Sequence, residues 1–307
     1  MTLTHRDLEW ELLLFFTMGS MRWKWLFICG CLGLTAAQAE LRENSVGQKL
    51  ALIPAGTQVL GSSPTEKGHR SDEKERSVSL TRSFYLGTTE VTQGQWHSLM
   101  GTTFSDLVNQ QEGPAGRGAK LKSTPSAEGS NQPMVFVNWP DALAFCDKLT
   151  AKEQTEGLIS KKARYGLPTE AEWEYACRAG TRTVFHYGDT LTSDIANFYG
   201  KKPYGIKAPG VYREKTTPVG RFAANRFGLH DMHGNVYEWC RDWYQEEANG
   251  GTDPVGPSSG DGRIIRGGAW DRQATSCRAA YRYSRDPVRR SHNIGFRVAL
   301  YGIDAAK

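Results

Sequence analysis

Beyond its first 39 residues, this 307-residue sequence lacks any stretch apolar enough to cross a bilayer, so we expect no transmembrane anchor in the folded part. It also lacks a strong excess of one charge, because 38 Lys and Arg stand against 33 Asp and Glu, a net charge of +5. An excess this mild, spread over a large domain, is not the footprint of a nucleic-acid-binding protein. Short-period repeats, coiled-coil heptads and a dividing linker are absent as well. These absences favour one globular domain and argue against a nucleic-acid partner.

Signals for long helices are few, whereas signals for turns are many. The chain has 33 Gly, 12 Tyr, 12 Phe and 9 Trp, which indicates many turns around an aromatic-rich core. Strands are predicted over short stretches such as 78–91, where apolar and polar residues alternate. Helices are predicted to begin at Thr92, to span Asp141–Leu149, and to begin again at the capping residue Thr169. The sequence therefore predicts an α+β fold with much irregular backbone.

Residues 1–39 have the pattern of a signal peptide with an over-long start. A short basic stretch at 21–24 precedes an apolar run at 25–37 that is too short to span a membrane. The run ends in Ala-Gln-Ala, the small-x-small pattern that a signal peptidase accepts. We therefore expect cleavage before Glu40 and a periplasmic or secreted mature protein. A lipoprotein leader modified at Cys31 is the second interpretation.

Two of the six cysteines would leave with this signal peptide. Those that remain are Cys146, Cys177, Cys240 and Cys277. Because exported proteins tend to oxidise their cysteines, we expect disulfides in the mature domain. Four cysteines allow three pairings, and the sequence alone does not choose between them.

Four sequence segments follow one another in a fixed order along the chain. They are Thr89–Thr92 with Trp96, Leu167–Gly180 (LPTEAEWEYACRAG), Phe227–Tyr244 (FGLHDMHGNVYEWCRDWY) and Arg266–Arg297 (RGGAW…CRAAYR…NIGFR). Together they resemble the formylglycine-generating enzyme (sulfatase-modifying factor) family over nearly all of residues 40–307. The resemblance implies a single domain across 40–307 with that family's irregular, C-type-lectin-like fold.

The resemblance implies more than one kind of function. Copper-dependent members oxidise a sulfatase cysteine to formylglycine, other members are oxidative maturation proteins, and some have no known chemistry. We therefore expect an exported oxidative maturation factor that acts on a peptide-like substrate, either a sulfatase cysteine or a siderophore precursor. The alternative is a non-catalytic, lectin-like binding module stabilised by calcium. Fold-level analogy does not choose between them, because function resides in the site.

A structural calcium (Ca2+) site is implied by the loop that runs from residue 231 to 238. Asp231, Gly234, Val236 and Glu238 match the spacing of such a site in the family. Two carboxylates seven residues apart, with backbone carbonyls between them, offer the oxygen ligands that a hard cation prefers. A second family calcium site begins at Asn197, but the stretch 209–213 lacks the expected acidic ligand.

A peptide-binding groove is implied by the Arg-Gly-Gly segment and the residues around it. Two adjacent glycines permit close backbone approach to an extended substrate. Arg282 would suit a carboxylate or a backbone carbonyl, and Asn293 an amide. The complete set of predicted groove residues is Tyr237, Gly267, Gly268, Ala269, Trp270, Arg282 and Asn293.

The copper chemistry of the family is not expected here. Its enzymes bind copper through two cysteines that follow the Arg-Gly-Gly segment, and Arg272 stands at the first of these positions. Cys277 falls on the second, so it is the candidate catalytic residue, but one soft ligand does not make a two-thiolate site. An alternative alignment places Cys277 beside a structural disulfide position of the relatives. On that basis we expect Cys277 to pair with Cys177 or Cys240.

Overall fold

The computed structural model describes residues 41–110 and 127–303. These residues belong to one compact unit, Ala39–Lys307. The predicted signal peptide and its cleavage site lie outside the described residues. Within the described ranges, every helix is too short or too polar to cross a membrane.

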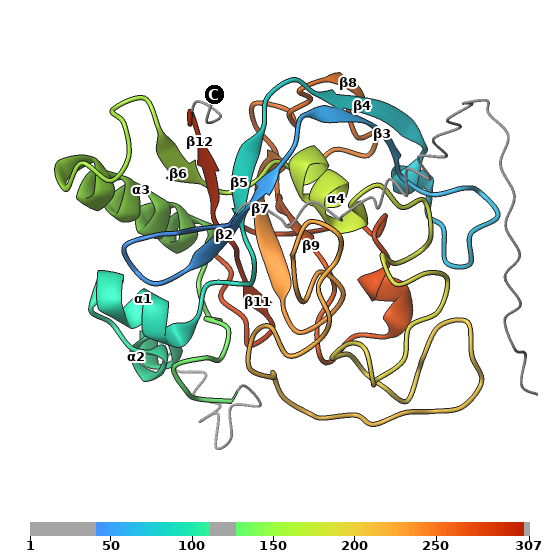
Figure 1. The fold of residues 1–307 in the computed structure, drawn as a ribbon. Coiled ribbons are helices and arrows are strands. Elements are labelled where there is room, and N and C mark those ends of the chain that lie inside the picture. The colour runs from blue at the N-terminus through green and yellow to red at the C-terminus, as the bar shows by residue number, and fades with distance from the viewer. Residues whose placement is uncertain (1–40, 111–126, 304–307) are drawn as a thin grey trace, which may run out of the picture. The chain divides into compact units, whose positions relative to one another are not determined.

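A five-stranded antiparallel sheet brings the two ends of the described chain together (Figure 1). Its order is β1-β2-β5-β12-β6, with β12 between β5 and β6. The C-terminal strand is therefore an inner strand of the sheet to which the N-terminal strands belong. The bounds are β1 (Leu41–Glu43), β2 (Lys49–Ile53), β5 (Phe84–Gly87), β6 (Arg164–Gly166) and β12 (Ala299–Tyr301).

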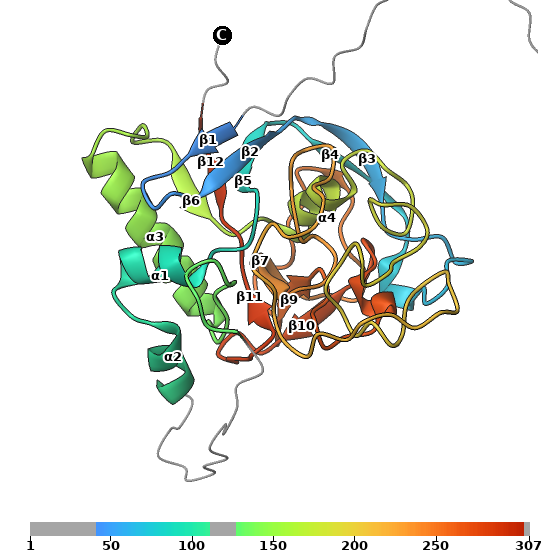
Figure 2. The ribbon, with the colours of Figure 1, turned by 60° about the horizontal axis from the view of Figure 1, so that its bottom comes forward.

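Two smaller sheets complete the strand structure. One has the order β10-β9-β7-β11, in which β11 runs parallel to β7 and β10 is an edge strand (Figure 2). The other pairs β3, β4 and β8. The bounds are β7 (Tyr237–Trp243), β9 (Arg263–Arg266), β10 (Tyr283–Arg285) and β11 (Ile294–Gly295), with β3 (Gly56–Leu60), β4 (Arg76–Leu80) and β8 (Gly251–Thr252).

The helices begin at residues that satisfy their own backbone. Thr92, Asn138 and Thr169 each form a capping box with the third helical residue, which confirms the caps predicted at Thr92 and Thr169. The helix predicted over Asp141–Leu149 is longer than expected, since it runs from Trp139 to Thr155. The bounds are α1 (Gln93–Met100), α2 (Phe104–Gln110), α3 (Trp139–Thr155) and α4 (Glu170–Arg178), with the 3-10 turns η1 (Ser71–Glu73) and η2 (Ala274–Cys277).

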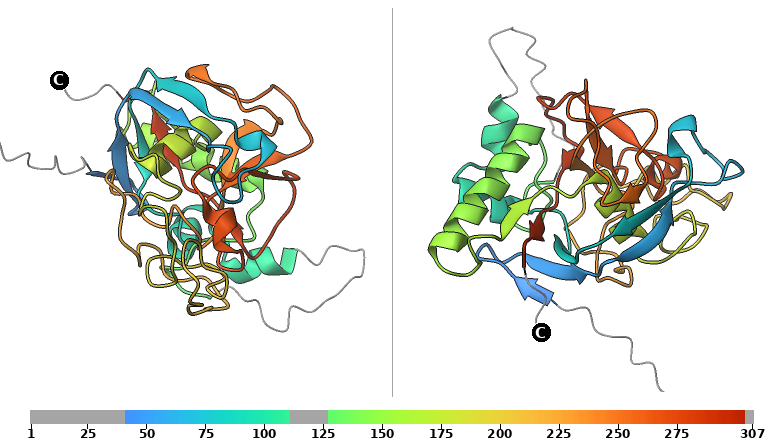
Figure 3. Two further views of the ribbon diagram at one scale, coloured as in Figure 1. Left: turned by 90° about the vertical axis from the view of Figure 1, so that its right-hand side faces the viewer. Right: turned by 90° about the horizontal axis from the view of Figure 1, so that it is seen from above.

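Aromatic side chains fill the core between the helices and the sheets. The helices α1, α2 and α3 gather on one side of the sheets (Figure 3). Phe145 of α3 stacks on Trp96 of α1 with ring centroids 5.7 Å apart, and it meets the edge of Phe296 at 5.4 Å. Such offset and edge-on pairs add to the free energy gained from burial alone. The predicted α+β class with few helices and an aromatic-rich core is confirmed.

Candidate functional site

A cavity of about 740 Å3 is lined by the end of β10, by the loop that follows it, and by the turn around Arg272. Phe136 and Tyr244 are among its lining residues. Most other lining side chains are polar or charged, among them Arg272, Arg285, Arg289, Arg290, His292 and Asn293. The cavity therefore joins the predicted groove residue Asn293 to Arg272, the residue at the first copper-cysteine position.

Asp271 fixes one wall of this cavity. Its carboxylate accepts hydrogen bonds from Asn293 Nδ2 at 2.9 and 3.1 Å and lies 3.3 Å from His292 Nε2. Arg272 Nε is 3.4 Å from the same carboxylate. Burial would raise the pKa of Asp271, but the bonds from His292 and Asn293 outweigh it and lower that pKa. An ionised Asp271 thus orients Asn293 and His292, a role that the sequence analysis missed.

The arginines of the cavity differ in how far their charge is compensated. Arg290 forms an ion pair with Asp141 and donates to the carbonyl of Phe136 at 2.9 Å. Arg285 lies over the ring of Tyr283 at 4.4 Å. Within 41–110 and 127–303, no carboxylate forms an ion pair with Arg285 or Arg289. The sequence signal for these residues is the basic run from 285 to 292, which the analysis did not single out.

The other predicted groove residues lie in the protein interior. Tyr237, Ala269 and Trp270 are buried, and Trp270 packs between Tyr212 and His292 with centroid distances of 6.1 and 5.5 Å. Burial raises the pKa of Tyr237. Trp270 thus supports the cavity wall through His292 without lining the cavity itself.

Gly267 and Gly268 serve internal packing. Their φ angles are +92° and +78°, which disfavour residues with a Cβ. A Cβ at Gly268 would lie 2.4 Å from Sγ of Cys277, and one at Gly267 would lie 3.2 Å from Cζ2 of Trp173. The two glycines therefore allow close packing against the protein's own core. This corrects their assignment to substrate contact.

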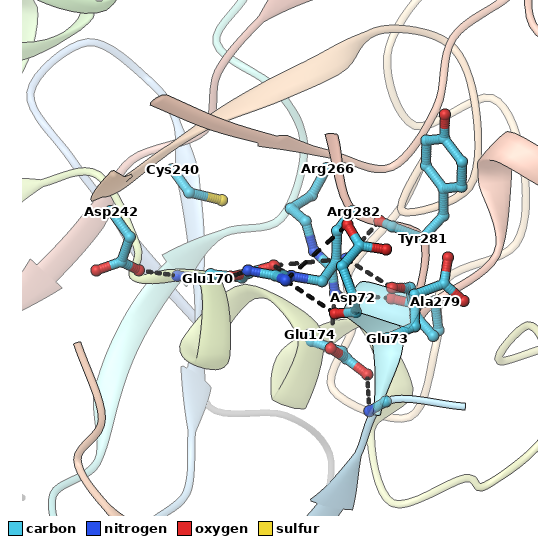
Figure 4. Close-up of polar contacts among 12 residues, drawn as sticks. Asp72, Glu73, Glu170, Glu174, Cys240, Asp242, Arg266, Ala279, Tyr281 and Arg282 are labelled. Carbon is cyan, nitrogen blue, oxygen red and sulfur yellow. Dashed lines mark hydrogen bonds and ion pairs between the residues drawn. The ribbon is translucent and has the colours of Figure 1, made fainter. Parts of the chain in front are cut away.

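Arg282 is also corrected from a groove residue to a buried structural one. Its guanidinium forms two bonds with Glu170 of α4, at 2.7 and 3.0 Å, and donates to the carbonyls of Asp72, Glu246 and Gln245. These partners occupy its donors, so it has none left for a substrate. Figure 4 shows Arg282 lying between Asp72 and the start of α4.

Arg266, from the Arg-Gly-Gly segment, belongs to the same buried network. Its Nη2 atom donates to Glu174 at 2.7 Å and to the carbonyl of Ala279 at 2.9 Å (Figure 4). Its Nη1 atom donates to the carbonyl of Ala280 at 3.0 Å. The family segment Arg-Gly-Gly therefore contributes a buried arginine, which pairs with Glu174 and more distantly with Glu170 at 3.8 Å, and two tight packing positions. Breaking such a pair by removing one partner is strongly destabilising.

Cys277, the doubtful catalytic candidate, is buried beneath Gly268. Burial raises the pKa of its thiol to about 12, whereas a reactive cysteine needs a lowered pKa. Its carbonyl accepts a 2.7 Å contact from His233 Nδ1, which ties η2 to the loop of residues 231–238. These contacts assign Cys277 a packing role.

The predicted disulfides are corrected as well. In the part of the chain that the structure describes, all four cysteines are free and buried. Cys277 packs in one hydrophobic cluster, Cys177 and Cys240 in a second, and Cys146 in the main core. The expected pairing of Cys277 with Cys177 or Cys240 is therefore not formed.

Some of the predicted calcium ligands already have their oxygens bonded to other groups of the protein. Both carboxylate oxygens of Glu238 are bonded to Arg297, at 2.6 and 2.7 Å, and one of them also accepts from Trp173 Nε1 at 2.7 Å. Glu238 therefore does not fit a ligand role, because its charge is already compensated. Gly234 and Val236 lie buried in the same loop. Among the described residues, no group of three or more His, Cys, Asp or Glu side chains is arranged to hold a metal.

Asp231 has a different partner from the one expected. Its Oδ2 atom accepts from the backbone of Gly220 at 2.6 Å, while Oδ1 is buried without a hydrogen bond. Glu90, which the sequence analysis missed, likewise has a buried, unbonded Oε2. Burial, and then the charges of Asp231 and Glu238, raise the pKa of Glu90 well above its ordinary value. Asp231 and Glu90 thus each have one buried oxygen without a hydrogen bond, and the charge of Asp231 acts on Glu90.

Near Asn197, the start of the second calcium site, a side chain supplies positive charge. Arg213 donates to the carbonyls of Ser193 and Ala196, at 2.7 and 3.4 Å. It belongs to the stretch in which the expected acidic ligand is missing. A guanidinium bonded to these carbonyls does not fit a second bound cation.

Residues 35–301 match the family model described as "Sulfatase-modifying factor enzyme 1-like domain". The chain is 27% identical to the formylglycine-generating enzyme of Mus musculus over 293 residues, covering 82% of this chain and 74% of the enzyme. It is 28% identical to the chaperone protein LppX of Paenibacillus barcinonensis, covering 84% and 92%. It is also 28% identical to the serine/threonine-protein kinase pkn1 of Chlamydia caviae, but it spans only 39% of that protein's length.

Two solved structures share the fold over most of this chain. The structure of PvdO from Pseudomonas aeruginosa matches with a TM-score of 0.65 and 25% identity, covering 85% of this chain and 98% of PvdO. The Treponema denticola variable protein 1 matches with a TM-score of 0.63 and 28% identity, covering 85% and 99%. The names of these similar proteins include an enzyme, a chaperone and a variable protein, so the common fold does not specify one activity.

Proposed function

We propose, from the premise that the chain belongs to the sulfatase-modifying factor enzyme 1-like family, that it is an exported maturation factor holding a peptide-like substrate in the cavity beside Arg272. The observation that carries this proposal is the cavity of about 740 Å3 beside Arg272, one wall of which Asp271 and Asn293 fix through their hydrogen bonds. The amide of Asn293 is itself buried, since Nδ2 donates to Asp271 and Oδ1 accepts from Ser291 Oγ at 2.7 Å, so it gives the wall a fixed shape for a substrate to bind against. The name of the enzyme from Mus musculus supports a role in protein maturation.

Copper oxidation by a pair of thiolates does not fit the residues of this chain. Arg272 stands at one position, and its positive charge disfavours a nearby cation. Cys277 at the other position is a buried thiol with a raised pKa. The proposal therefore includes no step through copper.

A second candidate is a binding module without catalysis, and the burial of Cys277 favours it. Incubation with oxygen, with and without added copper, distinguishes the two candidates. The probes are a peptide that carries a sulfatase cysteine and a peptidic siderophore precursor, and mass spectrometry follows their conversion. A peptide that is bound and covalently changed supports the maturation factor, and one that is bound and unchanged supports the module. An aldehyde formed at the cysteine would show that copper-type chemistry survives here.

We also propose that calcium stabilises the fold through Asp231 and Glu90 in place of Asp231 and Glu238. The support is the pair of buried carboxylate oxygens that have no hydrogen-bond partner. Such atoms are costly unless a cation or a proton compensates them. Calcium bound there would take oxygen ligands from both carboxylates and from backbone carbonyls, as a hard cation prefers.

A further inference from the structure

We infer that the cavity beside Arg272 selects an acidic peptide segment, which binds in extended form along the free edge of β10. This inference rests on the proposed function, since it names the substrate class of the same cavity. Two independent features carry it. One is the charge of the walls, and the other is the position of β10 in its sheet.

Two of the arginines in the walls, Arg285 and Arg289, have no ion-pair partner among the described residues, whereas Arg272 and Arg290 pair with Asp271 and Asp141. Four arginines line the cavity, namely Arg272, Arg285, Arg289 and Arg290, against the two carboxylates of Asp261 and Asp286. Only Arg290 is fully engaged, through Asp141 and the carbonyl of Phe136. An anionic ligand would meet the guanidinium groups of Arg285 and Arg289 in a concave surface, where electric fields are focused.

The partial pairing of Arg272 leaves it available to a ligand. Its contact with Asp271 is long at 3.4 Å, and its side chain is 41% exposed. The carboxylate of Asp271 also accepts from Asn293 Nδ2 at 2.9 Å and lies 3.3 Å from His292 Nε2, so it is shared among several partners. Arg285 and Arg289 have no carboxylate partner in the described chain, and a guanidinium matches a carboxylate through two parallel hydrogen bonds. A carboxylate ligand would therefore gain two or three strong partners at once.

The edge strand supplies a backbone template beside these charges. β10 is the terminal strand of its sheet, paired only with β9 in the described residues. Ser284 and Arg285 of β10 also line the cavity. A peptide that adds a strand to such an edge gains main-chain hydrogen bonds, while alternate side chains meet the adjoining pocket. A peptide that alternates acidic and apolar residues fits this arrangement, because alternate side chains point to the same face.

The cavity is also of a size that suits a peptide more than a single inorganic anion. Its volume of about 740 Å3 lies in the range of pockets that bind ligands of several functional groups. Its lining includes the aromatic residue Tyr244 and the polar residues Ser284 and Ser291 beside the arginines. A nucleic acid would use the charge but not the strand edge, so its binding is the competing outcome.

The test is fluorescence anisotropy with a short labelled peptide that alternates Glu and Val. We expect it to bind more tightly than the matched Gln-Val and Lys-Val peptides, and its affinity should fall as salt is raised. Arg285→Gln and Arg289→Gln should each weaken binding about tenfold, the loss expected for one charged hydrogen bond. The exposed Arg226, which does not line the cavity, supplies the control Arg226→Gln, which should bind as the parent does.

Two further probes separate the parts of the inference. A Glu-Val peptide with alternate backbone N-methyl groups keeps its charge but loses strand pairing, so it should bind more weakly. Equal binding of the Gln-Val peptide, equal binding of a single-stranded oligonucleotide, or unchanged binding by both arginine variants would overturn the inference. Failure of the conversion assay under Proposed function, with acidic-peptide binding intact, would remove the maturation role and keep the binding site.

Discussion

The Oε2 atom of Glu174 accepts a hydrogen bond from Nη2 of Arg266 at 2.7 Å, and neither side chain is exposed to solvent. The other oxygen accepts from Arg178 Nε at 2.9 Å and from the backbone of Gly61 at 2.7 Å. One carboxylate of α4 therefore joins β9 to its own helix end and to the turn after β3. This arrangement makes Glu174 a sensitive position for testing the fold.

Glu174→Gln should lower the free energy of unfolding by about 3–5 kcal/mol, because it leaves the buried guanidinium of Arg178 without its counter-charge and that of Arg266 with only Glu170, at 3.8 Å. Urea unfolding of the two proteins measures the difference. The matched control is Glu247→Gln at the exposed ion pair with Lys74, for which we expect no measurable change. Equal stability of Glu174→Gln and the parent would contradict the role assigned to this pair.

The effect of Glu174 should depend on pH. Burial alone would raise the pKa of Glu174, but Arg178, Arg266 and Arg76 hold it at about 2, below its ordinary value of 4.5. A carboxyl group with a lowered pKa in the folded state stabilises that state above its unfolded pKa and loses this effect as pH falls towards the folded one. The stability difference between parent and Glu174→Gln should therefore be constant above pH 4.5 and shrink between 4.5 and 2. A difference unchanged near the lower value would argue against an ionised Glu174.

Gly268→Ala should destabilise the protein more than Gly101→Ala does. Both glycines have a φ angle of +78°, so both substitutions carry the same backbone strain of about 1–2 kcal/mol. A Cβ at Gly101 meets no atom within 4 Å, whereas at Gly268 it lies 2.4 Å from Sγ and 2.9 Å from Cα of Cys277. The difference between the two melting temperatures isolates the packing cost. Cys277→Ala should recover only part of it, since Cα and the carbonyl of Ser276 also interfere.

The four cysteines of the described domain should react as buried thiols. A chain that begins at residue 40 should show no rapid reaction with a thiol reagent when native and four reactive thiols after denaturation. The raised pKa values of Cys177 and Cys277, about 12 through burial, predict slow native reaction even in mildly alkaline buffer. Addition of a reductant should leave the melting temperature unchanged. A melting temperature that falls in reductant would instead reveal a disulfide.

Calcium should raise the melting temperature through Asp231 and Glu90. A ligand that binds only the native state stabilises it in proportion to the logarithm of its excess over the dissociation constant. Melts in calcium and in chelator should therefore differ, and Glu90→Gln should remove the difference. The informative contrast is Glu238→Gln, which should destabilise the protein through Arg297 but preserve the response to calcium. An unaltered response in Glu90→Gln would exclude Glu90 as a ligand.

Local features of the fold could be predicted from the sequence. The caps at Thr92 and Thr169 were predictable because their signals lie within four residues of the chain. The end of α3 was not, since its last turns are polar and are held by contacts such as Glu153 with Ser45 and Tyr165. The strand order could not be predicted from local sequence either, because a pairing such as that of β12 with β5 joins segments that are distant along the chain.

The sequence alone does not identify the partners that a site residue contacts from distant parts of the chain. Asn293 lines the cavity, and its role in a substrate groove stays a prediction. Arg282 does not line it, because Glu170 neutralises it from 112 residues away and no local signal announces that contact. Glu90 and Asp271 were missed since a carboxylate's environment depends on which elements pack around it.

The position of β12 between β5 and β6 bears on how the chain folds as it is synthesised. Arg278 and Arg297 find Glu73 and the carbonyl of Gly87 only across 205 and 210 residues. Contacts so distant along the chain slow folding, because loop closure precedes any gain from them. A nascent chain that ends before residue 278 therefore lacks both arginines that bond to Glu73 and to the carbonyl of Gly87. The complete five-stranded sheet therefore cannot form before β12, near the end of the described chain, has been synthesised.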